Sequence, residues 1–256
     1  MPAADWNAST YDRVADPQTR WGGEVLERLP LRGDETVLDA GCGTGRVTEL
    51  LLARLPRGRV VALDSSAAML SEARGRLARF GDQVTYVEAD LGRPLPLSQP
   101  VDAVLSTATF HWVPDHDALL ANLAAVLRPG GWLVAQCGGA GNIATLLETA
   151  LAVHPGFQRE HRYETAEATK ARLETTGFVE VQTWLSDEPT RFDPGEPFEA
   201  FLETVCLRTF IAELPPDERK PFVKAVAARM PGPVLDYIRL NIVARRAPES
   251  DAGRPA

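Results

Sequence analysis

The chain has 256 residues, a hydrophobic content of 45% and a net charge of −8, which suits one folded domain with a sizeable core or a domain with a small cap. This acidic balance makes nucleic acid an unsuitable partner, and no apolar run approaches the roughly 20 residues that cross a membrane, so we expect neither contact. The three cysteines, Cys42, Cys137 and Cys206, are too widely spaced for a disulfide framework or a metal site, and the first residues carry no secretory pattern, so we expect a cytoplasmic protein, a monomer or a homodimer, without a bound metal.

Residues 37–136 alternate between apolar runs and helical patterns, the order that repeated β-α-β units produce. An apolar run without polar alternation predicts a strand that is buried on both faces of a parallel sheet. Ser65 or Ser66 is placed to cap the second helix, because a serine oxygen accepts a hydrogen bond from the first helical turn. The expected strands are 37–39, 60–64, 84–89, 101–106 and 132–137, and the expected helices are 46–55, 67–80 and 115–127.

Beyond residue 137 the pattern changes to mostly helical segments. Pro221 is expected in the first turn of its helix, because proline disrupts a helix interior. The last ten residues are polar and contain two prolines, so we expect a disordered tail. We expect one helix that ends near residue 153 and three further helices at 165–175, 198–214 and 221–230. The expected strands are 178–184 and 237–244.

A glycine loop, Gly41, Gly43 and Gly45, connects the first strand to its helix. Glycine reaches backbone angles that are closed to other residues and lets a ligand approach the main chain. Amides at the start of the following helix then face that ligand. A dinucleotide fingerprint would require a third glycine at position 46, where this chain has Arg46, so the spacing G-x-G-x-G with Asp39 before it favours a different cofactor.

Carboxylates follow the next two strands at the edge where open α/β sheets bind ligands. Asp64 is placed to accept hydrogen bonds from a ribose diol, or alternatively to complement a helix dipole. Asp90 is placed to accept from the amine of adenine, or to be an ordinary loop carboxylate, and Met69 to pack on adenine or in the core. The expected cofactor contacts, from loops 41–45, 64–66, 89–91 and 106–112 and the adjoining elements, are Asp39, Gly41, Cys42, Gly43, Asp64, Ser65, Met69, Ala89, Asp90, Leu91 and Thr107.

These motifs, together with the segment LRPGG at 127–131, resemble the class I methyltransferases that depend on S-adenosylmethionine (SAM). More narrowly, the chain resembles the trans-aconitate 2-methyltransferase family. The resembling segments are DWN at 5–7, FHWVPDH at 110–116, LR at 207–208 and IVARR at 242–246. The resemblance implies SAM as cofactor and S-adenosylhomocysteine (SAH) as product.

The resemblance also implies an α/β fold, a doubly wound and mostly parallel seven-stranded Rossmann-like sheet whose last strand is antiparallel, with a helical cap inserted before that strand. We therefore expect an N-terminal lid segment at 1–30, a SAM-binding core at 31–194, a cap at 195–235, the last core strand at 236–246 and the tail at 247–256.

The function expected from the resemblance is methyl transfer to a small-molecule acceptor, a carboxylate of a small organic acid such as trans-aconitate. A carboxylate is already ionised at neutral pH, so the reaction needs no catalytic base. Arginine matches a carboxylate with a planar fork of donors, and Arg20, Arg208 and Arg239 are the candidates, with ordinary surface arginine as the alternative for each.

Three further residues are candidates near the reacting methyl group. His111 is placed to orient the acceptor or to act as a general base. Trp112 is placed to contact the substrate. Arg208, already named as a carboxylate ligand, is also a candidate for a role in catalysis. The alternative for His111 is a hydrogen-bonded loop residue. Tyr11 is expected in a lid that excludes water, or as an aromatic anchor on the sheet edge.

Departures from the family pattern keep other acceptors open. The aromatic cap is represented by Phe198, Phe201, Phe210 and Phe222, and Asn241 replaces a phenylalanine near the end. A mixed aromatic cap also suits O-, N- or C-methylation of a natural product. The remaining alternatives are a nicotinamide oxidoreductase, which Arg46 disfavours, and a SAM-binding protein without catalysis.

Overall fold

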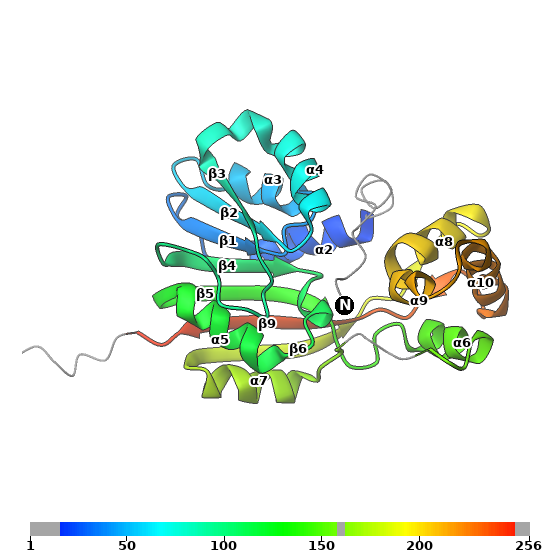
Figure 1. Ribbon diagram of the computed structural model, residues 1–256. Coiled ribbons are helices and arrows are strands. Elements are labelled where there is room, and N and C mark those ends of the chain that lie inside the picture. Colours follow the sequence, from blue (N-terminus) through cyan, green and yellow to red (C-terminus); the bar gives the residue numbers. More distant parts are fainter. Residues whose placement is uncertain (1–15, 158–161, 249–256) are drawn as a thin grey trace, which may run out of the picture.

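A computed structural model of the protein describes residues 16–157 and 162–248. Its centre is a seven-stranded sheet in the order β3-β2-β1-β4-β5-β9-β6 (Figure 1), and every neighbouring pair is parallel except the two that β9 makes. Helices on both faces confirm the predicted doubly wound α/β fold. The strands are β1 (Thr36–Ala40), β2 (Arg59–Asp64), β3 (Val84–Glu88), β4 (Val101–Thr107), β5 (Leu127–Gly138), β6 (Phe178–Asp187) and β9 (Ile238–Arg246), and a separate pair is β7 (Thr190–Arg191) and β8 (Val234–Leu235).

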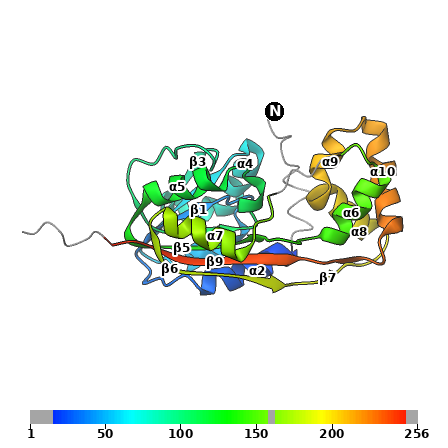
Figure 2. The ribbon, with the colours of Figure 1, turned by 90° about the horizontal axis from the view of Figure 1, so that it is seen from below.

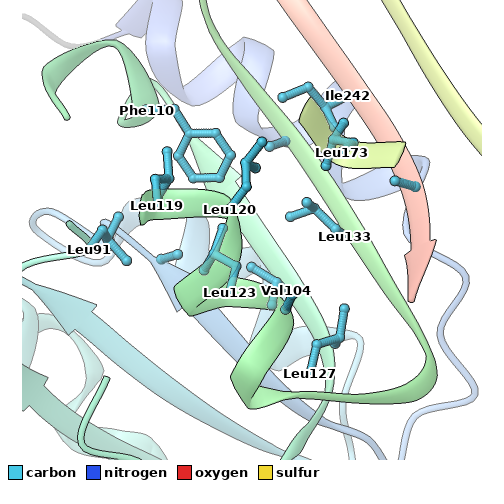
Figure 3. Close-up of a cluster of buried hydrophobic side chains, with 14 of the residues drawn as sticks. Leu91, Val104, Phe110, Leu119, Leu120, Leu123, Leu127, Leu133, Leu173 and Ile242 are labelled. Carbon is cyan, nitrogen blue, oxygen red and sulfur yellow. The ribbon is translucent and has the colours of Figure 1, made fainter. Parts of the chain in front are cut away.

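Side chains of the central strands alternate between two hydrophobic clusters. Leu133 and Ala135 of β5 belong to one cluster and Val134 to the other, as the two-residue period of a strand requires. Figure 3 shows the first cluster, and Figure 2 shows α7 and α2 on opposite sides of β9. The first cluster is covered by α5 (His116–Val126) and α7 (Ala166–Thr175), and the second by α2 (Asp16–Glu27), α3 (Arg46–Ala53) and α4 (Ala67–Leu77), which a 3-10 turn, η1 (Ala78–Gln83), extends.

A second body of helices, the cap, lies beyond the carboxyl ends of the parallel strands (Figure 1). Strand β5 leads into this body and α10 leads back to β9. It has its own hydrophobic cluster, which Trp21 of α2 joins. Its helices are α6 (Ala144–Val153), α8 (Glu196–Phe201), the π-helical η3 (Leu202–Cys206), α9 (Arg208–Ala212) and α10 (Pro216–Arg229), so α6 packs with the cap although it precedes the range 195–235.

The predicted continuous helix 198–214 is wrong. A π-helical turn interrupts it, in which the Leu207 amide donates to the Leu202 carbonyl at 2.8 Å. Leu202 and Leu207 are both buried in the cap cluster. Five residues do not fit the 3.6-residue period of an α-helix, and the wider turn lets both leucines face the same core.

Pro221 is not in the first turn of its helix, as predicted, but inside α10. The helix begins earlier because Pro216, which follows another proline, occupies its first turn, where a missing amide costs nothing. Pro221 cannot donate to the carbonyl of Asp217, four residues before it. Asp217 is exposed, so water can hydrate that carbonyl and the helix continues.

Several predicted features lie outside the described residues, namely Tyr11, the DWN segment at 5–7 and residues 249–256 of the tail. Of the predicted lid 1–30, Asp16–Glu27 forms α2, which packs on the sheet. In the part of the chain that the structure describes, no helix combines the length and the apolar character that crossing a membrane requires.

Candidate functional site

The glycine loop between β1 and α3 is fixed by main-chain bonds to the end of β2. The amides of Gly41 and Cys42 donate to the Leu63 carbonyl at 2.8 and 2.9 Å. Gly41 has φ +86°, and a Cβ added there would collide with the side chain of Thr109. The loop therefore packs directly against the segment that follows β4, and only glycine fits at this contact.

Gly43 faces open space instead. A Cβ built on Gly43 would meet no described heavy atom within 4 Å, although its φ of +54° still favours glycine. A ligand can approach the main chain closely at this position. The loop thus has one side closed by Thr109 and one side open.

Asp64, at the end of β2, holds the open side of the loop. Its two carboxylate oxygens accept the amides of Gly43 and Ser66, each at 2.9 Å. Ser66 caps α4, because its hydroxyl accepts the Met69 amide at 3.2 Å. Of the two predicted capping residues, the cap is therefore Ser66, and Ser65 is exposed. The Asp64 residue is half-buried and its carboxylate faces the glycine loop, whereas Met69 is buried.

Asp39 is fully buried beneath the loop. Its Oδ2 accepts the Thr48 hydroxyl at 2.6 Å, whereas its Oδ1 has no hydrogen-bond partner within the described residues. Burial raises the pKa of this carboxyl to about 7, against the lowering effect of the Thr48 bond. A buried acceptor without a donor is uncommon in folded proteins, and a donor on a bound ligand would satisfy it.

The segment after β3 lies beside Asp64, because the Ala89 amide donates to the Asp64 carbonyl at 3.1 Å. Asp90 is exposed, and its Oδ1 accepts the Gly92 amide at 2.8 Å. Leu91 instead packs into the hydrophobic cluster under α5 (Figure 3). Of the three predicted residues, Ala89 therefore contacts the end of β2, Asp90 is exposed, and the Leu91 side chain is part of the core.

The end of β4 supplies two residues that the sequence did not single out. Ala108 has φ +56°, and its amide donates to the Gln136 carbonyl at 2.7 Å. The Thr109 hydroxyl donates to the carbonyl of the predicted Thr107 at 2.9 Å and lies against Gly41. A positive φ at alanine carries no sequence signal, and it is the kind of strain found at functional sites.

His111 belongs to the 3-10 turn η2 (Phe110–Trp112) and is 7% exposed. Its Nδ1 accepts the Gly138 amide at 3.3 Å. An imidazole that accepts at Nδ1 carries its proton on Nε2, so in this arrangement His111 presents a donor at Nε2. The ring centroids of Trp112 and Tyr163 lie 5.2 and 5.7 Å from that of His111.

Arg208, at the start of α9, reaches from the cap to the sheet. Its guanidinium carbon lies 5.4 Å from the ring centroid of Trp112, a cation–π arrangement. The π-helical turn ends at Cys206, two residues before Arg208. The structure thus brings together two of the predicted substrate residues across the boundary between core and cap.

Arg239, on β9, is 3% exposed. Its Nε donates to Gln136 Oε1 at 3.3 Å, and its guanidinium carbon lies 4.6 Å from the ring centroid of Trp21. In the sheet Arg239 pairs with Gly138, whose amide binds His111. Arg239 and His111 therefore flank the same residue at the carboxyl end of β5.

Arg20 contacts the same indole as Arg239, with its guanidinium carbon 5.9 Å from the ring centroid of Trp21. Its guanidinium pairs with Glu188 at 3.2 Å, and 60% of its side chain is exposed. Trp21 Nε1 donates to the same carboxylate oxygen at 3.3 Å. Across the ranges 16–157 and 162–248, no group of three or more histidine, cysteine or acidic side chains is arranged to hold a metal.

Comparisons with known proteins give a family for this arrangement. A sequence profile described as "Methyltransferase domain" matches residues 37–131. A trans-aconitate 2-methyltransferase of Methylobacterium radiotolerans is 31% identical, covering 95% of this chain and 99% of that protein. Another, of Rhodopseudomonas palustris strain BisB18, is 32% identical over 89% of this chain and 90% of that protein.

The solved structures share the fold. A Haemonchus contortus phosphoethanolamine N-methyltransferase 2, in complex with phosphomonomethylethanolamine and SAH, matches with a TM-score of 0.64 and 19% identity. The match covers 94% of this chain and 57% of that protein, so this chain spans little more than half of its length.

Proposed function

Because this chain belongs to the trans-aconitate 2-methyltransferase family, we propose that it transfers the methyl group of SAM to a carboxylate of a small organic acid, with trans-aconitate as the first candidate. The observation that carries this proposal is a pair of arginines, Arg208 against Trp112 and Arg239 opposite Gly138, whose amide binds His111. Arg208 comes from the cap and Arg239 from the last strand. Two fixed cations suit an acceptor with more than one carboxylate better than an apolar natural product.

The glycine loop and its neighbours fit SAM. The open face at Gly43 would accept the amino-acid part of the cofactor, and Asp39 Oδ1 would gain the donor that it lacks. Asp64 would hold the ribose and Asp90 the adenine. When bound, SAM supplies a methyl group on a positively charged sulfur.

The acceptor side needs alignment rather than proton removal. A carboxylate is ionised at neutral pH, so a donor at His111 Nε2 and the guanidinium groups of Arg208 and Arg239 would orient it without a base. The indoles of Trp112 and Trp21, which lie against the two arginines, would limit water around them. Exclusion of water strengthens these charge interactions.

The experiment is a steady-state assay of SAH formation with SAM and trans-aconitate, with the methyl ester identified by mass spectrometry. We expect turnover by the parent, and a KM for the acid that rises by about 10- to 100-fold in Arg208→Ala, because a charged hydrogen bond contributes roughly 1.5–3 kcal/mol. Arg79→Ala is the matched control, since Arg79 pairs with Glu49 on the surface. If neither trans-aconitate nor any other small acid is converted to a methyl ester, the proposal is rejected.

A further inference from the structure

A buried polar network lies on the face of the sheet that α2 covers. Gln136 of β5 pairs directly with Asn241 of β9, and Arg239 is two residues before Asn241 on the same face. Gln136, Asn241 and Arg239 are 2%, 0% and 3% exposed. Polar side chains this deeply buried are retained only where their hydrogen bonds are satisfied.

The orientation of the two amides is set by Arg28, the residue directly after α2. Arg28 Nη1 donates to Asn241 Oδ1 at 2.6 Å, and a guanidinium can only donate, so the oxygen of the Asn241 amide must face Arg28. Gln136 Nε2 donates to that same oxygen at 2.8 Å. The amide of Gln136 therefore points its nitrogen toward Asn241 and its oxygen toward Arg239.

The Asn241 nitrogen is oriented in the same way. It donates to Ser186 Oγ at 3.0 Å and to the Arg239 carbonyl at 3.2 Å. Arg28 itself is held over the Trp184 ring, 5.0 Å from its centroid. An apolar side chain at 241 could neither accept from Arg28 nor orient Gln136.

The Arg239 guanidinium is oriented by the amide oxygen of Gln136. Gln136 Oε1 accepts from its Nε at 3.3 Å, while the Trp21 ring lies against it at 4.6 Å. A carboxamide is neutral, so this contact orients the guanidinium without cancelling its positive charge, as a glutamate in the same place would.

We propose that Gln136 and Asn241 are positioning residues that hold the Arg239 guanidinium in one orientation for a carboxylate of the acceptor, with Arg28 fixing the orientation of both amides. This inference rests on the proposed function and adds to it a relay from the N-terminal helix to the acceptor side of the site.

The test is calorimetric titration of the SAH-saturated protein with trans-aconitate. Gln136→Met removes both hydrogen bonds at similar volume and should weaken binding about tenfold. Asn241→Leu should do the same, since Gln136 is then free to turn its amide. Gln136→Glu should weaken binding by at least as much, because its charge would neutralise Arg239. Arg79→Ala, which removes a surface ion pair with Glu49, should leave the Kd within about twofold.

A double-mutant cycle separates positioning from general damage to the fold. Adding Gln136→Met to Arg239→Ala should cost no further affinity for the acid, because Gln136 acts through Arg239. Affinity for SAH should stay within about twofold in every variant, and Gln136→Glu keeps a hydrophilic side chain if the others fold poorly. Unchanged acid binding in Gln136→Met, or additive losses in the cycle, would overturn the relay alone, whereas a parent that binds no acid would overturn both proposals.

Discussion

Asp39 links the cofactor side of the site to stability. Burial raises the pKa of its carboxyl to about 7 in the folded chain, from the ordinary value of 3.8. Between these values the folded state keeps a proton that the unfolded state releases. The stability that the protonated carboxyl provides is therefore fully present below about pH 4 and is lost as the pH rises through about 7.

We expect the Asp39→Asn variant not to lose this stability as the pH rises. Compared with the parent, the variant without cofactor should gain roughly 3–4 kcal/mol in free energy of unfolding between pH 4 and pH 8, since each pKa unit is worth about 1.4 kcal/mol. Urea unfolding at several pH values measures the difference. Thr48→Val removes the hydrogen bond that favours the ionised carboxyl, so it should steepen the pH dependence. Parallel curves for Asp39→Asn and the parent would contradict the assignment.

The glycine loop allows a matched pair of substitutions at the scale of one element. In Gly41→Ala the added methyl meets Thr109 in a residue with φ +86°, so we expect a loss of roughly 2–5 kcal/mol in stability. In Gly43→Ala only the backbone angle is unfavourable, at about 1–2 kcal/mol, but the methyl would occupy the open face.

Gly43→Ala should therefore remain folded and lose at least about tenfold in SAH affinity, since the main chain can no longer be approached closely. Thermal unfolding and calorimetric titration with SAH measure the two effects separately. Equal stability losses in the two variants would show that the loop is not closed on one side and open on the other.

Elements that depend on local chemistry could be predicted from the sequence. The glycine loop, the Ser66 cap and the strands of the β-α-β units follow from residue types that act within one turn. The π-helical turn at Leu202–Cys206 could not, because it arises from the demand that Leu202 and Leu207 enter one core. The predicted position of Pro221 in its helix was wrong for a related reason. A proline is tolerated inside a helix where water can hydrate the carbonyl four residues before it, and the sequence pattern does not show this exposure.

The same division holds for the site as a whole. The cofactor side is formed by residues that each follow a strand directly, so their edge of the sheet is predictable. The acceptor side depends on pairing between β5 and β9, and Arg28 meets Asn241 across 213 residues of sequence. No periodicity marks Gln136 or Asn241 as polar residues of a core.

The separate hydrophobic cluster of the cap predicts separate stability. Phe210→Ala removes a ring that is 1% exposed and lies 5.1 Å from the Phe157 ring, at a cost of roughly 3–5 kcal/mol. We expect hydrogen exchange to accelerate in α6 and α8 to α10, with the strands still protected. The KM for the acid should rise while SAH affinity is retained.

Leu123→Ala is the matched control, because Leu123 is equally buried in the cluster under α5 (Figure 3). It should accelerate exchange in α5 and β4 and leave the cap protected. Loss of protection across the whole chain in Phe210→Ala would mean that cap and sheet unfold as one unit.

Strand β9 occupies the place between β5 and β6, although it is the last strand of the sheet to leave the ribosome. A nascent chain can complete its glycine loop early, but until residues 238–246 emerge, β5 and β6 each present an unpaired backbone edge. Products truncated before β9 would keep both edges exposed, and such edges recruit other chains. Protection of both edges thus depends on β9, which also carries Arg239.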